Sequence, residues 1–239
     1  MRESFFKMNL KDYIFCALDF SDLNQTIEFT DIIKNDIGGI KLGLEFFANN
    51  GPSGVEKLKK FKLPIFLDLK LHDIPNTVKN TVKNILKLQP DYLTIHLSGG
   101  RKMLEEVNKI KKNTKIIGVS MLTSLDKKDL KEIGLELTEK EYVKNLVALG
   151  IDAGVDGVVT SPAEAELLRK EFSKKLILVT PGIRLPNTDL NDQKRSQSPG
   201  LAIKSGSSML VIGRPITKST KPVKIIKLIM KDIEEKIGS

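Results

Sequence analysis

The chain has 239 residues, of which 40% are hydrophobic and 29% charged, a balance typical of a soluble globular protein with one large domain or two small ones. It contains no apolar run of about 18 residues and no apolar signal-peptide region near Met1, so we expect neither a membrane span nor a secretory signal. Cys16 is the single cysteine, which excludes an intrachain disulfide and fits a reducing cytoplasm.

The net charge of +9 could indicate a nucleic-acid partner. The lysines, however, are spread over predicted helix faces, as at 57–60 and 109–112, and do not form one stripe with interleaved aromatic residues. Tryptophan is absent and aromatic residues make up only 5% of the chain, so platforms for base stacking are scarce. We therefore expect no nucleic-acid and no membrane partner, and a basic field that favours an anionic substrate.

Short apolar segments alternate with helical patterns from one end of the chain to the other. Each is apolar on both faces, as a parallel strand covered by helices should be. In chain order, the expected strands are 13–18, 39–42, 64–67, 92–95, 115–121, 157–160, 176–180 and 209–212.

Helical patterns occupy the gaps between these strands. The first is expected over 23–37, with Ser21 and Asp22 as candidate caps. Another begins after Pro75, whose fixed φ suits a first helical turn. Further apolar helical spacing starts at Val143 and, at the end of the chain, at Val223. The charged segment 127–141 is expected to be a solvated insertion before its helix.

Eight strands alternating with about eight helices predict a single (β/α)8 TIM barrel of the α/β class. We expect it to span 1–239 as one domain, with 1–10 as an N-terminal extension. A doubly wound open sheet is the alternative, but no G-x-G-x-x-G motif follows the first strand.

Three charged residues follow the third expected strand within six positions: Asp68, Lys70 and Asp73. Because side chains alternate between the faces of a strand, Asp68 and Lys70 should point the same way. Two carboxylates and an ammonium group packed at a strand end are a poor arrangement for stability and a good one for a reaction centre. A structural ion pair between Asp68 and Lys70 is the alternative interpretation.

A (β/α)8 barrel places its active site at the carboxyl ends of its strands. In this chain polar residues gather at those ends, while the strand interiors are mostly apolar. In strand order they are Asp19, Lys41, Asp68 with Lys70, His96, Thr123, Thr160, Arg184 and Arg214. For Asp19 a helix cap, and for His96 a structural role with satisfied hydrogen bonds, are the alternatives.

The turns after the last two strands have the form of a phosphate site. The segment from Pro181 to Arg184 follows the seventh strand, and Gly213-Arg214-Pro215 follows the eighth. Barrels commonly bind phosphate at this position. Glycine lets backbone N–H groups approach an anion, and arginine adds fork-shaped charged donors.

Together these segments resemble the orotidine 5′-phosphate decarboxylase family over nearly the whole chain. The matching motifs are Leu18-Asp19, Lys41-Leu42-Gly43, the run from Asp68 to Thr77, Leu122-Thr123-Ser124, the run from Thr180 to Arg184 and the run from Ile212 to Pro215. Asp192-Gln193-Lys194-Arg195 is similar to the loop after the seventh strand in shorter, bacterial-type members. The resemblance implies decarboxylation of orotidine 5′-phosphate (OMP) to UMP and CO2, the last step of de novo pyrimidine biosynthesis, without a cofactor.

The related magnesium-dependent keto-sugar-phosphate decarboxylases and hexulose-phosphate synthases are the alternative. They share the Asp-x-Lys-x-x-Asp strand, but their second strand supplies a glutamate as metal ligand. That position is Lys41 here, and a charged lysine cannot ligate a divalent cation. We therefore expect no metal site and favour the metal-free decarboxylase.

The resemblance also implies roles for individual residues. Lys41, Asp68, Lys70 and Asp73 would form an alternating array of charges that carries catalysis. Lys70 would stabilise the carbanion at C6 and donate the proton, and Asp68 would lie beside the substrate carboxylate. Asp73 would come from the second subunit, so the enzyme would be a homodimer with shared active sites.

The remaining expected contacts divide by the part of the substrate that they bind. Asp19 and Lys41, with Asp73 and Thr77 of the second subunit, would bond the ribose hydroxyls. Ile74 would pack near the leaving CO2, and Thr123 would bind the pyrimidine amide edge. The phosphate side would be formed by Pro181, Arg184, Gly213 and Arg214. Gln193, in the polar stretch 187–199, would fold over the ligand; an ordinary loop residue is the alternative.

Overall fold

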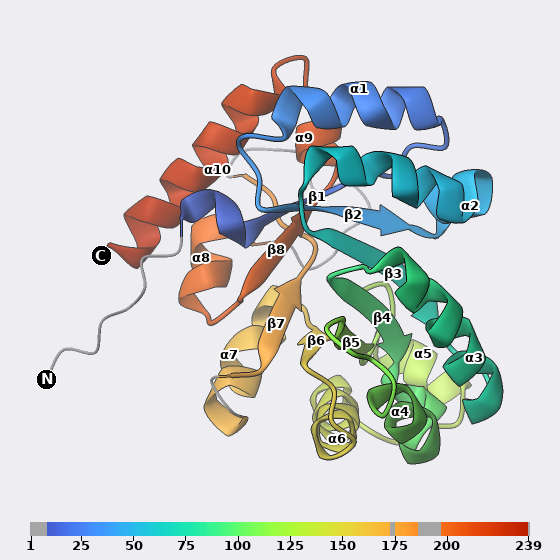
Figure 1. The fold of residues 1–239 in the computed structure, drawn as a ribbon. Coiled ribbons are helices and arrows are strands. Elements are labelled where there is room, and N and C mark those ends of the chain that lie inside the picture. Colours follow the sequence, from blue (N-terminus) through green and yellow to red (C-terminus); the bar gives the residue numbers. More distant parts are fainter. Residues whose placement is uncertain (1–8, 173–174, 186–196, 239) are drawn as a thin grey trace, which may run out of the picture.

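The computed structural model describes residues 9–172, 175–185 and 197–238 and forms a closed barrel of eight parallel strands (Figure 1). Hydrogen bonding follows chain order around the barrel, and β8 pairs with β1 to close it. The strands are β1 (Ile14–Ala17), β2 (Gly39–Gly43), β3 (Ile65–Leu71), β4 (Tyr92–His96), β5 (Lys115–Val119), β6 (Gly157–Val159), β7 (Ile177–Thr180) and β8 (Met209–Ile212). The predicted (β/α)8 barrel is therefore confirmed.

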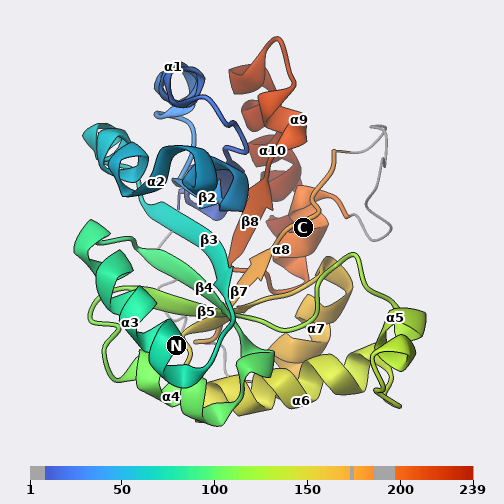
Figure 2. The same cartoon turned by 90° about the vertical axis from the view of Figure 1, so that its right-hand side faces the viewer.

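Helices surround the strands on the outside of the barrel. The α-helices are α1 (Leu23–Ile33), α2 (Leu44–Leu58), α3 (Pro75–Ile85), α4 (Arg101–Asn108), α5 (Lys127–Glu132), α6 (Glu139–Asp152), α7 (Pro162–Glu171), α8 (Pro199–Lys204), α9 (Arg214–Thr217) and α10 (Pro222–Ile237). Short 3-10 helices are η1 (Leu10–Tyr13), η2 (Lys59–Phe61), η3 (Leu86–Leu88) and η4 (Leu97–Gly99). The last helix, α10, packs along α8 and also contacts α1 (Figure 2).

Local sequence signals explain where several helices begin. Asp22 caps α1 because its carboxylate accepts the backbone N–H of Gln25 at 2.6 Å. Pro75 occupies the first position of α3, where the missing N–H costs no helical bond. Thr138 caps α6, and Glu141 bonds back to it in a capping box.

Several predicted boundaries differ from the structure by one or more residues, and one predicted insertion was wrong. The first helix ends at Ile33 rather than at 37. The fifth strand ends at Val119 rather than at 121. The charged segment 127–141 is not a plain insertion, since it contains α5 and the first turn of α6. Asp126, just before that segment, and Thr138 within it act as caps, and charged side chains that can face solvent are compatible with a short helix.

The largest difference concerns the third strand, which was expected to end at 67. Strand β3 continues to Leu71 and therefore includes Asp68 and Lys70. Its pairing with β4 shifts register, because Leu67 lies opposite Leu93 whereas Leu71 lies opposite Ile95. Three β3 residues therefore face one β4 residue. This bulge lies where the charged residues leave the apolar interior.

The apolar core has two parts. Side chains inside the barrel form one cluster: Phe15, Ala17, Phe66, Ile117, Val179, Met209 and Val211. A larger cluster fills the space between the strands and the helices. Cys16 belongs to this outer cluster, and burial raises the pKa of its thiol. Within the described residues no helix is both long and apolar enough to cross a membrane.

Candidate active site

A cavity of about 270 Å³ opens at the carboxyl ends of the strands. Its polar lining comes from strands on opposite sides of the barrel: Asp19, Lys41, Asp68, Lys70, Thr123, Arg184 and Arg214. Pro181 and Gly213 line it as well. Its floor is apolar and is built from Ala17, Phe66, Val119, Val159, Val179 and Val211. Nine of the residues expected from the sequence therefore share one cavity, although their positions in the chain span from 19 to 214.

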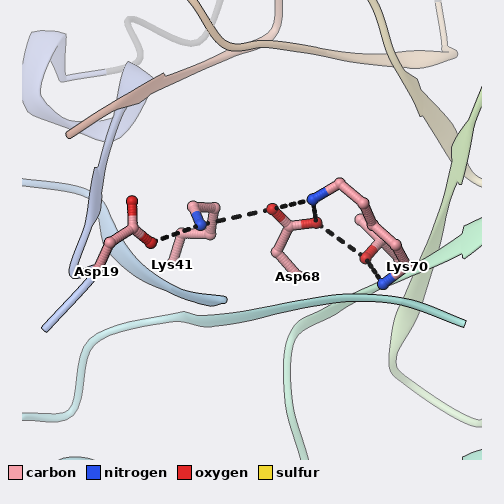
Figure 3. A network of polar contacts seen from close by, with 5 residues as sticks. Asp19, Lys41, Asp68 and Lys70 are labelled. Atoms are coloured by element: carbon pink, nitrogen blue, oxygen red, sulfur yellow. Dashed lines mark hydrogen bonds and ion pairs between the residues drawn. The ribbon is translucent and has the colours of Figure 1, made fainter. Parts of the chain in front are cut away.

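Four of the lining side chains form a continuous row of alternating charge (Figure 3). Lys41 Nζ lies 3.2 Å from Asp19 Oδ1 and 3.4 Å from Asp68 Oδ2. Lys70 Nζ donates to both carboxylate oxygens of Asp68, each at 2.8 Å. Both lysines therefore approach one carboxylate, and Asp19 extends the row toward the first strand.

Burial strengthens the electrostatic interactions between the side chains of this row. The side chains of Lys41 and Asp68 are only 10% and 13% exposed, respectively, so water screens their interaction weakly. Burial by itself would raise the pKa of Asp68. The charges of Lys41 and Lys70, with hydrogen bonds from Lys70 and Thr94, outweigh it and lower this pKa below its usual range. Asp68 is therefore an anion held between two cations at neutral pH.

The backbone of Lys70 has a left-handed conformation, with φ of 46°. Such a value is uncommon for a residue with a side chain and persists only where surrounding contacts hold it. Here the N–H of Lys70 donates to Thr94 Oγ1 at 2.8 Å. The same hydroxyl donates to Asp68 Oδ1 at 3.0 Å. Thr94, on the adjacent strand β4, is thus hydrogen-bonded to both Lys70 and Asp68 of β3.

The two arginines line the cavity from the ends of the neighbouring strands β7 and β8. Arg184 is buried, and one of its guanidinium nitrogens donates to the carbonyl oxygen of Ile183 at 2.9 Å. Arg214 is the first residue of α9 and follows Gly213. Gly182, before Arg184, has a φ of 77°, which a residue with a side chain rarely adopts. Two arginines from neighbouring strands therefore line the same cavity, and their guanidinium groups are suited to bind an anion.

Three expected site residues do not line the cavity of their own subunit. Asp73, Ile74 and Thr77 lie at the junction of β3 and α3 and are exposed, Ile74 by 66%. The carboxylate of Asp73 accepts only the adjacent N–H of Ile74, at 2.6 Å, among the hydrogen bonds that the structure describes for it. Ile74 therefore does not line the cavity of its own subunit, and its expected contact with the leaving group stays a prediction. Gln193 lies outside the described residues.

The two histidines lie beside the charged row and outside the cavity lining. The rings of His72 and His96 are 5.1 Å apart and tilted by 31°. Burial, with smaller effects from His72 and Lys70, lowers the pKa of His96. A neutral His96 in a ring contact fits the structural role better than a catalytic one.

Sequence reasoning missed Thr94 and the apolar floor of the cavity. Thr94 lies between Leu93 and Ile95 in a buried strand, and all three are completely buried. A polar side chain in such a strand was the available signal, because a buried hydroxyl needs a hydrogen-bond partner. The floor residues gave no signal of their own, since valines inside a barrel are ordinary core residues. Among the described residues, no group of three or more His, Cys, Asp or Glu side chains is placed to hold a metal ion.

Comparison with known proteins gives a consistent result. The model of the "Orotidine 5'-phosphate decarboxylase / HUMPS family" matches residues 12–229. Curated proteins named orotidine 5'-phosphate decarboxylase are similar over nearly their full length. One from Wolbachia pipientis subsp. Culex pipiens is 47% identical over 224 residues, covering 93% of this chain and 99% of the relative. One from Ehrlichia chaffeensis is 44% identical over 225 residues, covering 93% and 97%.

Solved structures show the same relationship. The crystal structure of orotidine 5'-phosphate decarboxylase from Lactobacillus acidophilus is 33% identical, with a TM-score of 0.81 over 92% of this chain and 98% of that one. An uncharacterized conserved protein from Geobacillus kaustophilus is 30% identical, with a TM-score of 0.80 over 92% and 99%. The similarity extends over the strands that carry the cavity.

Proposed function

This chain belongs to the orotidine 5′-phosphate decarboxylase / HUMPS family, and on that premise we propose how its cavity carries out the reaction. The activity is the decarboxylation of OMP to UMP and CO2, a step of pyrimidine biosynthesis. The magnesium-dependent sugar-phosphate reaction is not favoured. Lys41 occupies the position of the expected metal ligand and points its ammonium group at Asp68.

The observation that carries the mechanism is the row Asp19, Lys41, Asp68 and Lys70 on the cavity wall (Figure 3). Loss of CO2 from C6 leaves an electron pair with no adjacent π system to accept it. A cation fixed beside C6 stabilises that charge without reorganising, and the gain is large in a site with little water. Lys70 supplies this cation and then donates a proton to C6, which completes UMP.

Asp68 has two roles in this mechanism. It holds the ammonium group of Lys70 through two hydrogen bonds of 2.8 Å, which fixes the proton donor in position. It also lies where the substrate carboxylate would approach. Two like charges in a poorly hydrated cavity disfavour bound substrate relative to the transition state, in which the carboxylate charge has moved to C6.

The remaining groups bind the parts of OMP that do not react. Asp19 and Lys41 bond the ribose hydroxyls, and Thr123 bonds the amide edge of the pyrimidine. Arg184 and Arg214, with Pro181 and Gly213 beside them, bind the phosphate. Binding energy from the phosphate end then positions C6 against Lys70. Gln193 adds a bridge between phosphate and base in this proposal.

We further propose that the enzyme is a homodimer whose subunits complete each other's active sites. The proposal is supported by Asp73, Ile74 and Thr77, which are exposed at the junction of β3 and α3 and do not line the cavity of their own subunit. An exposed isoleucine beside an exposed aspartate fits a contact that a second subunit buries. Asp73 would then extend the row of charges beyond Lys70. The whole chain would act as one catalytic domain in the cytoplasm, with OMP as its small-molecule ligand.

The proposal is tested by following the ultraviolet absorbance of OMP in the presence of EDTA. Wild-type protein should convert OMP to UMP rapidly without added metal. Lys70→Ala should lose at least about 10⁴-fold in kcat, because it removes both the electrostatic stabilisation and the proton donor. Lys57→Ala, on the outer helix α2, is the matched control and should retain full activity. Normal turnover by folded Lys70→Ala protein would refute the mechanism.

A further inference from the structure

The bulge in β3 leaves a single β4 residue opposite the two catalytic side chains. Leu67 pairs with Leu93 and Leu71 pairs with Ile95, so on the β4 side only Thr94 faces the segment that carries Asp68 and Lys70. Regular backbone pairing is interrupted there. The side chain of Thr94 takes its place, because it bonds to the Lys70 N–H at 2.8 Å and to Asp68 Oδ1 at 3.0 Å.

The direction of these two bonds is fixed by chemistry. The backbone N–H of Lys70 can only donate, so the Thr94 oxygen accepts its hydrogen. An ionised carboxylate can only accept, so the single hydroxyl hydrogen of Thr94 points to Asp68. Both bonds form together when Asp68 carries its charge. The hydroxyl therefore connects the backbone of one catalytic residue to the side chain of the other.

Thr94 is also well placed to hold this geometry. It is completely buried, as are its neighbours Leu93 and Ile95, and it does not line the cavity. A β-branched side chain is restricted at χ1, and complete burial restricts it further, so its oxygen has little freedom to move. Lys70 needs such a fixed partner, because its φ of 46° is not a conformation that the residue would keep unaided.

From these contacts we propose that Thr94 is a positioning residue for decarboxylation, an inference that rests on the proposed function. Its hydroxyl fixes the Lys70 backbone and the Asp68 carboxylate relative to each other, so that the ammonium group meets C6 at the distance that proton transfer requires. It touches neither substrate nor the reacting atoms. Its loss should therefore affect the chemical step more than substrate binding, which depends on the distant phosphate end.

The test compares substitutions that keep or remove the hydroxyl. Thr94→Val keeps the shape and removes both bonds; we expect kcat to fall by about 10- to 100-fold and KM to change by less than about threefold. Thr94→Ser keeps the hydroxyl and should retain kcat within about threefold of wild type. Thr114→Val is the matched control. Thr114 is equally a buried threonine, and its hydroxyl bonds the carbonyl oxygen of Pro90 at 2.7 Å, before β5 rather than at the cavity.

Each result separates a positioning role from a general effect on folding. Wild-type kcat in folded Thr94→Val, or equal losses in Thr94→Val and Thr94→Ser, would overturn the proposal. So would an equal loss of kcat in Thr114→Val. If Thr94→Val does not fold, Thr94→Cys replaces it, because cysteine fills a volume close to that of threonine and its thiol forms only weak hydrogen bonds. A kcat equal to that of Thr94→Ser in this variant would overturn the proposal. Absence of OMP turnover in the wild type itself would instead refute the proposed function.

Discussion

Lys70 Nζ lies 2.8 Å from both carboxylate oxygens of Asp68, although the backbone between them departs from regular strand geometry at Lys70. In a regular strand, the side chains of residues i and i+2 point in the same direction and lie parallel to each other. At the bulge the ammonium group of Lys70 instead contacts both oxygens of the Asp68 carboxylate. A left-handed residue costs of order 1–3 kcal/mol, and the symmetric two-oxygen contact beside the cavity is formed in this strained conformation.

The pH dependence of stability should reveal the charged state of Asp68. Its pKa is lowered in the folded protein, so on acidification the unfolded chain takes up the proton first. The resulting stabilisation is complete above the unfolded pKa of about 3.9 and is lost as the pH falls through the folded pKa. Urea unfolding of Asp68→Asn between pH 3 and 7 should therefore show a shallower loss of unfolding free energy in acid. Identical pH slopes for the variant and the wild type would contradict the lowered pKa.

Mixing two inactive variants should restore activity if the subunits share their active sites. A dimer of Lys70→Ala with Asp73→Ala has one site in which both residues are intact. Random exchange of subunits makes half of the dimers mixed, so we expect about a quarter of wild-type activity. The measurement is OMP turnover before and after joint refolding, with each variant refolded alone as control. A mixture no more active than its components would place Lys70 and Asp73 of one subunit in the same site.

Removing Arg214 should weaken binding of the substrate phosphate. A charged hydrogen-bonded contact contributes about 1.5–3 kcal/mol, so Arg214→Ala should lower kcat/KM for OMP by about 10- to 100-fold. Orotidine, which has no phosphate, provides the control. Its much slower turnover should change by less than about threefold. An equal loss with both substrates would mean that Arg214 acts on the reacting end.

Strand packing around the barrel leaves no room for a side chain at Gly157. A Cβ atom there would overlap the backbone carbonyl oxygen of Ile177 on the next strand, and a backbone atom in a closed barrel cannot move aside. Gly157→Ala should lower the unfolding free energy by about 1–3 kcal/mol, measured by thermal or urea unfolding. At Gly118 the overlap is with the side chain of Leu97, which can shift more easily than a backbone atom, so Gly118→Ala should lose less. The reverse order would contradict this packing argument.

The barrel followed from the sequence because its evidence is local. Buried parallel strands are apolar on both faces, and helices between them leave a clear periodic pattern. Such patterns locate an element well but its ends poorly. The prediction stopped the third strand at 67 because Asp68 and Lys70 are charged, yet β3 continues to Leu71. Charge indicates exposure to a solvent or a cavity, and it does not by itself end a strand.

The residues of the candidate site also divide into those that the sequence predicted and those that it did not. Strand ends gave the polar lining, since a barrel brings all its carboxyl ends to one face. Thr94 was missed because its role depends on a register shift between β3 and β4. Strand register depends on the pairing of two distant segments and cannot be derived from the local sequence pattern of one of them. Asp73 and Thr77 were expected to bind the substrate of the second subunit. In the structure they are exposed and do not line the cavity of their own subunit.

By itself the sequence determined the class of fold, the family and the residue types available at the strand ends, because these depend on pattern and composition. Only the tertiary structure decided which of those residues meet. Distances such as 2.8 Å between Lys70 and Asp68, or 3.4 Å between Lys41 and Asp68, arise from the closure of the barrel and from one bulge. The tertiary structure also decided how deeply each charged side chain is buried. Burial sets the strength of the electrostatic interactions in the row, because the local dielectric depends on the surrounding atoms and not on the order of residues in the chain.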